Sequence, residues 1–316
     1  MGILSGWDQR HPAGRQDCSH RNTWALHLAR HRLRCLHLRC ESRPGARTAI
    51  NTEPHYNSIL QDFLFRDKTH YHSPVLGVDS PVDKYSYLGM AVTSGNFLPT
   101  SRNCGEYLSY AVGAPRSNGT GQVVIFVKCH SELLKVQLVL SGDNFASQFG
   151  YALTTADVDN DGLADLFVAA PFYHAEQAGG AVYYYRNSPE GLDPSVKPLV
   201  LKGRRSESRF GFAVSSAGDV NNDGFEDLVV GAPYDNNGAV FLFQGSANGI
   251  RTKPSQIIHA EDIPGFPLQT FGYSLSGGLD MDLNNHSDIL VGAYESDSVV
   301  ILRARPVIDI ITWFGE

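Results

Sequence analysis

The sequence lacks the signatures of the common enzyme classes. It contains no His-Glu-x-x-His zinc motif, no Gly-x-Ser-x-Gly nucleophile elbow and no phosphate-binding loop that ends in Gly-Lys-Ser or Gly-Lys-Thr. His27 and His31 are four residues apart, but Leu28 stands where a zinc protease needs glutamate. The sequence therefore predicts no enzyme activity.

Long apolar runs and paired cysteines are also missing. No stretch reaches the roughly 20 apolar residues of a membrane-spanning helix, and residues 1–40 are interrupted throughout by Arg, His and Asp where a secretory signal would be apolar. The five cysteines include no Cys-x-x-Cys pair. Cys104 and Cys129 can pair within one structural unit or remain free thiols, and sequence spacing does not decide between the two. The sequence as written is expected to be a soluble polypeptide.

The charge is unevenly distributed along the chain. The formal net charge is −7, but residues 1–50 contain nine Arg, no Lys and three acidic residues, which makes that segment +6 and the remainder −13. An acidic body argues against nucleic acid as a partner and suits a surface that takes up cations.

A repeat of about sixty residues organises the rest of the chain. Each copy has an aromatic-Gly pair, an Asp-rich loop, an apolar run, a turn resembling Gly-Ala-Pro and a second apolar run. Three full copies begin at Phe149, Phe210 and Phe271, which are spaced 61 residues apart. A fainter copy without the Asp-rich loop begins at Leu88. Such regularity indicates a repeat architecture.

The apolar runs of each copy predict short β-strands. They are rich in β-branched and aromatic residues, as in 166–170 and 181–185, and hairpin turns are expected at 177–180 and 235–238. About four short strands per sixty residues, with no helical period between them, are typical of a propeller blade. The predicted fold is all-β, with four-stranded antiparallel sheets arranged as a partial β-propeller.

The three Asp-rich loops share one order of oxygen-bearing side chains. Each has nine positions, with Asp or Asn at positions 1, 3, 5 and 9 and a backbone carbonyl available at position 7. Calcium takes about six to eight oxygen ligands, so the sequence predicts about three Ca²⁺ sites. The expected ligands are Asp157, Asp159, Asp161, the Leu163 carbonyl and Asp165 in loop one; Asp219, Asn221, Asp223, the Phe225 carbonyl and Asp227 in loop two; and Asp280, Asp282, Asn284, the His286 carbonyl and Asp288 in loop three.

Two other interpretations compete with calcium binding. An EF-hand needs a bidentate Glu at position 12 and flanking helices, whereas position 12 here is Val168, Val230 or Val291. Asp, Asn and Gly also form turns without any metal, but three copies in phase with the repeat, each with crowded carboxylates, favour a cation. In loop three Asn285 replaces the Gly of position 6 and must adopt the left-handed conformation, so this loop is expected to bind most weakly.

The Phe-Gly pair, the Asp-rich loop and Gly-Ala-Pro, repeated at about sixty residues, resemble the FG-GAP repeats of integrin α subunits. The resemblance covers about 87–306 and implies about four blades, similar to blades four to seven of a seven-bladed propeller. Residues 306–316 resemble the start of a thigh-like domain, and 51–86 are interpreted as the remnant of a preceding blade. Residues 1–50 resemble nothing in the family and are either a mispredicted first exon or a basic arm.

The resemblance implies a fragment of a cell-adhesion receptor. Such an α subunit pairs with an integrin β subunit and recognises extracellular-matrix proteins at the cell surface, as part of a type I membrane protein whose membrane segment this chain lacks. The calcium loops would stiffen the lower propeller face, opposite the face that reads the ligand. Three absent blades leave the ring open, so the fragment alone is expected to be marginally stable or to aggregate.

Two alternatives to a receptor stay open. The repeats could form the propeller module of a secreted or glycosylphosphatidylinositol-directed hydrolase, or a soluble calcium-binding scaffold. The sequence does not indicate which β subunit or matrix ligand an integrin of this kind would use.

Overall fold

The computed structural model describes residues 81–98, 108–128, 134–176, 178–265 and 267–306. They form four antiparallel sheets, and the only helical elements among them are 3₁₀ turns of three residues. The all-β prediction is confirmed. All five cysteines, the leader 1–50 and the segment 307–316 lie outside the described residues. Of the segment 51–86, only 81–86 is described.

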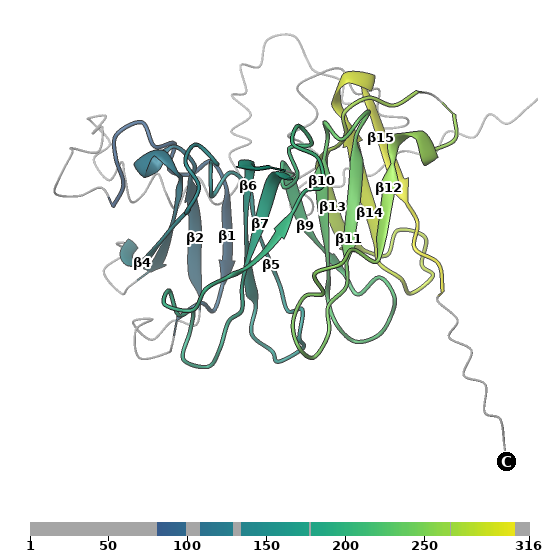
Figure 1. Ribbon diagram of the computed structural model, residues 1–316. Coiled ribbons are helices and arrows are strands. Elements are labelled where there is room, and N and C mark those ends of the chain that lie inside the picture. Colours follow the sequence, from purple (N-terminus) through teal and green to yellow (C-terminus); the bar gives the residue numbers. More distant parts are fainter. Residues whose placement is uncertain (1–80, 99–107, 129–133, 177, 266, 307–316) are drawn as a thin grey trace, which may run out of the picture. The chain divides into compact units, whose positions relative to one another are not determined.

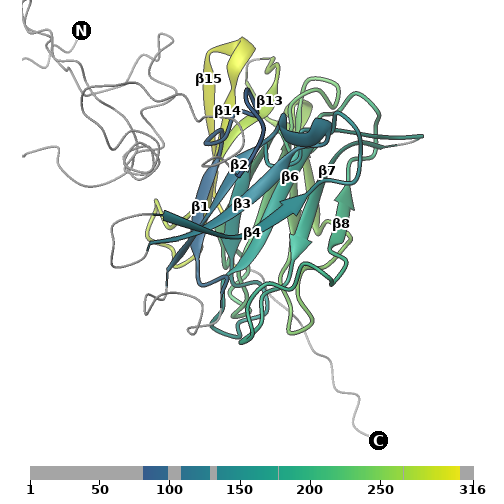
Figure 2. The ribbon, with the colours of Figure 1, turned by 90° about the vertical axis from the view of Figure 1, so that its left-hand side faces the viewer.

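Each sheet is built from strands in chain order (Figure 1). The first sheet contains β1 (Val92–Gly95), β2 (Ser109–Ala114), β3 (Gln122–Lys128) and β4 (Leu134–Ser141); the second contains β5 (Leu153–Ala156), β6 (Asp165–Ala175), β7 (Ala178–Tyr185) and β8 (Leu199–Lys202); the third contains β9 (Ala213–Gly218), β10 (Asp227–Ala232), β11 (Ala239–Phe243) and β12 (Gln256–His259); the fourth contains β13 (Phe271–Leu279), β14 (Asp288–Ala293) and β15 (Ser298–Leu302). Figure 2 looks onto the first sheet, where β1 to β4 follow one another.

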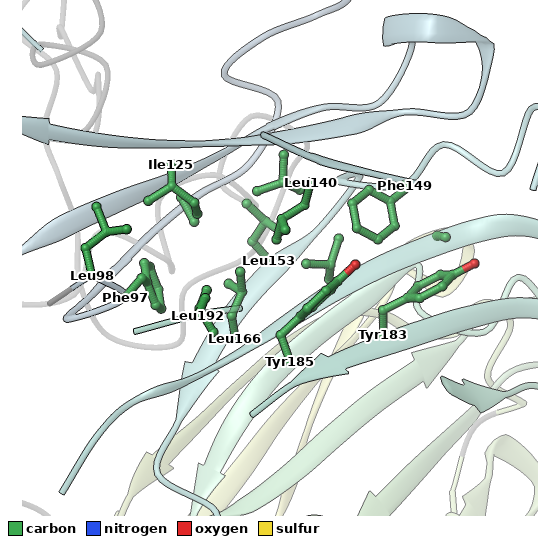
Figure 3. Close-up of a cluster of buried hydrophobic side chains, with 14 of the residues drawn as sticks. Phe97, Leu98, Ile125, Leu140, Phe149, Leu153, Leu166, Tyr183, Tyr185 and Leu192 are labelled. Atoms are coloured by element: carbon green, nitrogen blue, oxygen red, sulfur yellow. The ribbon is translucent and has the colours of Figure 1, made fainter. Parts of the chain in front are cut away.

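Successive sheets pack face to face through alternate residues of their strands. In β6, Leu166 and Val168 join a core shared with the first sheet, whereas Phe167 and Ala169 join a core shared with the third. Figure 3 shows the first of these cores, with Ile125 of the first sheet among the side chains of the second. Successive side chains of a strand point to opposite faces of its sheet, and in the central strands both faces are buried, so these strands are apolar throughout.

The phenylalanine of each aromatic-Gly pair links neighbouring sheets. Phe149, Phe210 and Phe271 are fully buried, and each packs in a core between its own sheet and the preceding one. The backbones also meet, through single parallel bridges from Gly180 to Phe210 and from Gly238 to Phe271. A Cβ atom on Gly238 would lie 2.2 Å from the Phe271 carbonyl oxygen, so the contact requires glycine.

The structure corrects one predicted turn. The sequence predicts that the strand ends near Pro171 and that residues 177–180 form the hairpin turn. Instead β6 continues to Ala175, and Ala178 to Gly180 already belong to β7. A register shift between Ala170 and His174 lets the strand pass the proline, which cannot donate to the sheet.

The fourth sheet has three strands within the described residues, whereas each of the other three sheets has four. Its last strand, β15, alternates between half-buried and exposed residues, including Val299 and Ile301. The four sheets correspond to the four repeats of the sequence, so the described region is a partial propeller of FG-GAP-like blades.

Candidate metal sites

The three Asp-rich loops occupy equivalent places in consecutive sheets. They join the first strand to the second: β5 to β6, β9 to β10 and β13 to β14. Position 12 of each loop lies in the second strand, at Val168, Val230 and Val291, and all three are fully buried. Strands on both sides of each loop exclude the EF-hand arrangement of flanking helices.

All three loops wrap their backbone around the first carboxylate. Both oxygens of Asp157 accept hydrogen bonds, from the N–H of position 5 at 3.1 Å and from that of position 6 at 2.9 Å. Asp219 and Asp280 make the same pair of bonds at 2.7 to 3.1 Å. In each loop the side chain of position 5 also accepts from the N–H of position 7, at 2.8 to 3.1 Å. The three loops therefore share one local structure.

Positions 4 and 6 of every loop are left-handed. At position 6, φ is 83° for Gly162, 89° for Gly224 and 65° for Asn285, so the left-handed conformation predicted for Asn285 is confirmed. Position 4 was not anticipated from the sequence. Asn occupies it in loops one and two, with φ of 54° and 61°, but loop three has Leu283 with φ of 62°. Leucine is disfavoured there because its Cβ crowds the following carbonyl.

Carboxylates converge in loops one and three. One oxygen each of Asp157, Asp159 and Asp161 lie within 4.8 Å of one another, and so do oxygens of Asp280, Asp282 and Asp288. In loop two the position 3 residue is an amide, and Asn221 Nδ2 donates to Asp223 Oδ2 at 2.9 Å. At position 3, loop two therefore has a neutral amide that donates a hydrogen bond, where loops one and three have a carboxylate.

The position 9 carboxylates tie each loop to the end of the third strand of its sheet. Oδ1 of Asp165, Asp227 and Asp288 accepts from the N–H of the second residue after that strand, at 2.7 to 3.1 Å. Oδ2 accepts a second bond, from the Tyr184 hydroxyl in loop one and from the N–H of position 2 in the other loops. Burial raises the pKa of Asp165 to about 7 and that of Asp227 to about 6, although these bonds oppose the shift.

Asp159 is a buried carboxylate without a hydrogen bond. Its side chain is 1% exposed, and neither oxygen has a hydrogen-bond partner within the described part of the chain. Arg186 Nη2 lies 2.5 Å from Asp159 Oδ2, and the two side chains form an ion pair. Burial raises the pKa of Asp159, the charge of Arg186 lowers it, and Asp161 raises it further. Asp159 therefore already has one positive partner, Arg186, and a buried carboxylate that needs a cation beside it fits a cation site.

Hydrogen bonds also join neighbouring loops. The N–H of Glu226, in loop two, donates to the Asp157 carbonyl at 3.3 Å, and a Glu226 carboxylate oxygen accepts from the Asp157 N–H at 3.1 Å. Between loops two and three, Asn222 Nδ2 donates to the Asn285 carbonyl at 3.2 Å, and the ring Nδ1 of His286 lies 3.1 Å from the Val220 carbonyl. The sequence predicts a ligand role for the His286 carbonyl only, whereas its ring also connects two loops.

Residues after the third strand were missed from the sequence. Arg186 and Asn187 follow β7, Gly245 follows β11 and Ala304 follows β15, and all of them contact the loop of their own sheet. Antiparallel topology carries the signal that could have identified them. In such a sheet, the end of the third strand lies at the same edge as the connection between the first two.

None of the helical turns in the described part of the chain has the length and apolar character that a membrane-crossing helix requires.

Comparisons with known proteins agree with this architecture. The FG-GAP repeat family matches residues 149–185 and 210–243, which contain the Asp-rich loop and the first three strands of the second and third sheets. Integrin alpha-7 of Rattus norvegicus is 45% identical over 227 residues, which cover 71% of this chain and 19% of the relative. Integrin alpha-6 of Gallus gallus is 41% identical over 233 residues, covering 73% and 21%, and integrin alpha-3 of Cricetulus griseus is 40% identical over 242 residues, covering 74% and 23%.

These relatives favour the receptor interpretation over a hydrolase module. The chain spans about a fifth of the length of the relatives that it matches. Two of the described sheets match the FG-GAP repeat family, and over the matched region the chain is similar to integrin α subunits.

Proposed function

We propose that this chain forms a calcium-stabilised segment of the propeller of an adhesion-receptor α subunit and has no enzymatic role. The observation that carries the proposal is the shared structure of three acidic loops at equivalent places in consecutive sheets, two of which match the FG-GAP repeat family. One of these loops also holds the buried carboxylate of Asp159, whose counter-ion among the described residues is Arg186. Turn formation alone would not require a buried carboxylate there, because its charge needs a compensating cation, which in the metal-free protein is the half-exposed Arg186.

The loops offer only oxygen ligands, which suit a hard cation such as Ca²⁺. The side chains of positions 1, 3, 5 and 9 and the carbonyl of position 7 would hold the ion in each loop. For loop one these are Asp157, Asp159, Asp161, Asp165 and the Leu163 carbonyl. A bound ion would neutralise crowded carboxylates and fix the connection between the first two strands of its sheet, so its effect is on stability.

The relatives suggest the setting in which this segment works. Their names identify them as integrin α subunits, and an α subunit of this kind would pair with an integrin β subunit at the cell surface and contact an extracellular-matrix protein. Because the chain matches only about a fifth of these relatives, most of the surfaces for such contacts would come from elsewhere in a complete α subunit.

Calcium titration of the full chain tests the proposal. Isothermal calorimetry, combined with thermal unfolding, is expected to show about three sites and a higher melting temperature with Ca²⁺ than with a chelator. Asp161→Ala, Asp223→Ala and Asp282→Ala should each remove one site. A folded protein that binds no calcium and melts at the same temperature with and without it would refute the metal sites.

A further inference from the structure

We propose that Arg186 is an internal counter-cation that competes with the metal ion for loop one. This inference rests on the calcium sites proposed above and goes beyond them, because it assigns a role to a residue outside the loops. In the metal-free protein the guanidinium of Arg186 neutralises Asp159. Calcium must displace it, so loop one binds calcium more weakly than its own ligands would allow.

The two side chains differ sharply in exposure. Asp159 is 1% exposed, whereas Arg186 is 51% exposed, and the pair joins Nη2 to Oδ2 at 2.5 Å. The guanidinium therefore reaches a buried carboxylate from the solvent side. Because the Arg186 side chain is half exposed, its charge stays in contact with water when the side chain turns away from Asp159. The ion pair can therefore open when another cation takes the place of the guanidinium beside Asp159.

Arg186 binds a carboxylate that the metal ion would also need, so the two cations compete for Asp159. Asp159 is position 3 of loop one, and its carboxylate lies within 4.8 Å of oxygens of Asp157 and Asp161. An ion held by these three carboxylates would take an oxygen of Asp159. A guanidinium that stays on Asp159 would lie within a few ångströms of this ion, where two positive charges repel each other strongly in a partly buried setting.

The other two repeats lack this ion pair. The residue after the third strand is Gln244 in the third sheet, where it is neutral and accepts a hydrogen bond from Arg251 at 3.1 Å. In the fourth sheet the equivalent residue is Arg303, which is exposed. Among the described residues, the ion pairs are Arg186 with Asp159 and Arg205 with Asp235, so only loop one carries a protein cation on a candidate ligand.

The substitution Arg186→Gln tests this role, because it gives loop one the residue of the third sheet. Calorimetry on the full chain is expected to show about tenfold tighter calcium binding at one site and unchanged binding at the others. With a chelator present, the same variant should melt at a lower temperature than the wild type, because Asp159 loses its counter-cation. A residue that merely supports the structure would lower both stability and affinity.

Three further variants make the test specific. Adding Asp161→Ala to Arg186→Gln should abolish the tightened site and thereby assign it to loop one. Arg186→Lys keeps the charge and should leave affinity close to that of the wild type. Arg205→Gln removes an equal charge from the other ion pair and should leave all calcium affinities unchanged.

The two proposals fail in different ways. If the chain binds calcium at its loops but Arg186→Gln leaves every affinity unchanged or lower, the role of Arg186 is refuted and the calcium sites stand. If no loop binds calcium in any variant, both proposals are refuted.

Discussion

Replacing Leu283 by Asn is expected to stabilise the protein. Leu283 occupies position 4 of loop three with φ of 62°, and its side chain is 85% exposed, so it contributes little packing to offset the strain. A left-handed conformation costs an ordinary L-residue roughly 1–2 kcal/mol, whereas Asn tolerates it. Asn160 and Asn222 already hold this position in the other loops with nearly the same φ. We therefore expect Leu283→Asn to raise the free energy of unfolding by about 1 kcal/mol.

The assay is equilibrium unfolding of the full chain in urea with a chelator present, so that calcium binding does not contribute. For a folded region of this size, a gain of about 1 kcal/mol corresponds to a melting temperature about 2–4 °C higher. Leu283→Ala is the matched control, because it removes the exposed apolar side chain but leaves at this position a residue that, like Leu, does not favour a positive φ. If Leu283→Ala stabilises as much as Leu283→Asn, the gain comes from removing an exposed leucine and the backbone argument is wrong.

Three more substitutions test the packing and the loops. Phe210→Ala should lower the free energy of unfolding by about 3–5 kcal/mol in a urea titration, because the ring is fully buried between two sheets, and a loss below 1 kcal/mol would contradict this packing. Gly238→Ala should cost about 1–3 kcal/mol in the same assay, since its new Cβ would lie 2.2 Å from the Phe271 carbonyl oxygen, and unchanged stability would show that the two sheets do not meet there. Asp227→Ala should destabilise the protein by about 1–3 kcal/mol even with a chelator, because two N–H groups would lose a buried acceptor. Asp223→Ala should cost less without calcium, because Asp223 is exposed and water can replace the hydrogen bonds that it accepts. Equal losses would refute a separate structural role for Asp227.

Much of the fold followed from the sequence because one pattern recurs. The 61-residue spacing of Phe149, Phe210 and Phe271 set the repeat, and the apolar runs after each Asp-rich loop are strands in the structure. The extension of β6 beyond Pro171 could not be foreseen. Proline normally ends a central strand, and the register shift that accommodates it depends on pairing with β7, which is a tertiary property.

The candidate site was predictable within each loop but not across the sheet. The order of oxygen-bearing residues identified the loops, and a positive φ at Asn285 followed from the missing glycine. Three features needed coordinates: the left-handed Leu283, the contact of Arg186 with a loop that begins 29 residues earlier, and the two hydrogen bonds that occupy Asp165. The last two depend on the third strand returning to the edge of the sheet that carries the loop.

A crystal structure grown with calcium tests the central claim most directly. The account predicts one anomalous calcium peak in each of the three loops, with oxygens of positions 1, 3, 5, 7 and 9 at about 2.3–2.6 Å from the ion. Three loops that keep the backbone arrangement described above but show no peak at saturating calcium would contradict the claim, and the Asp-rich loops would then be turns without a metal.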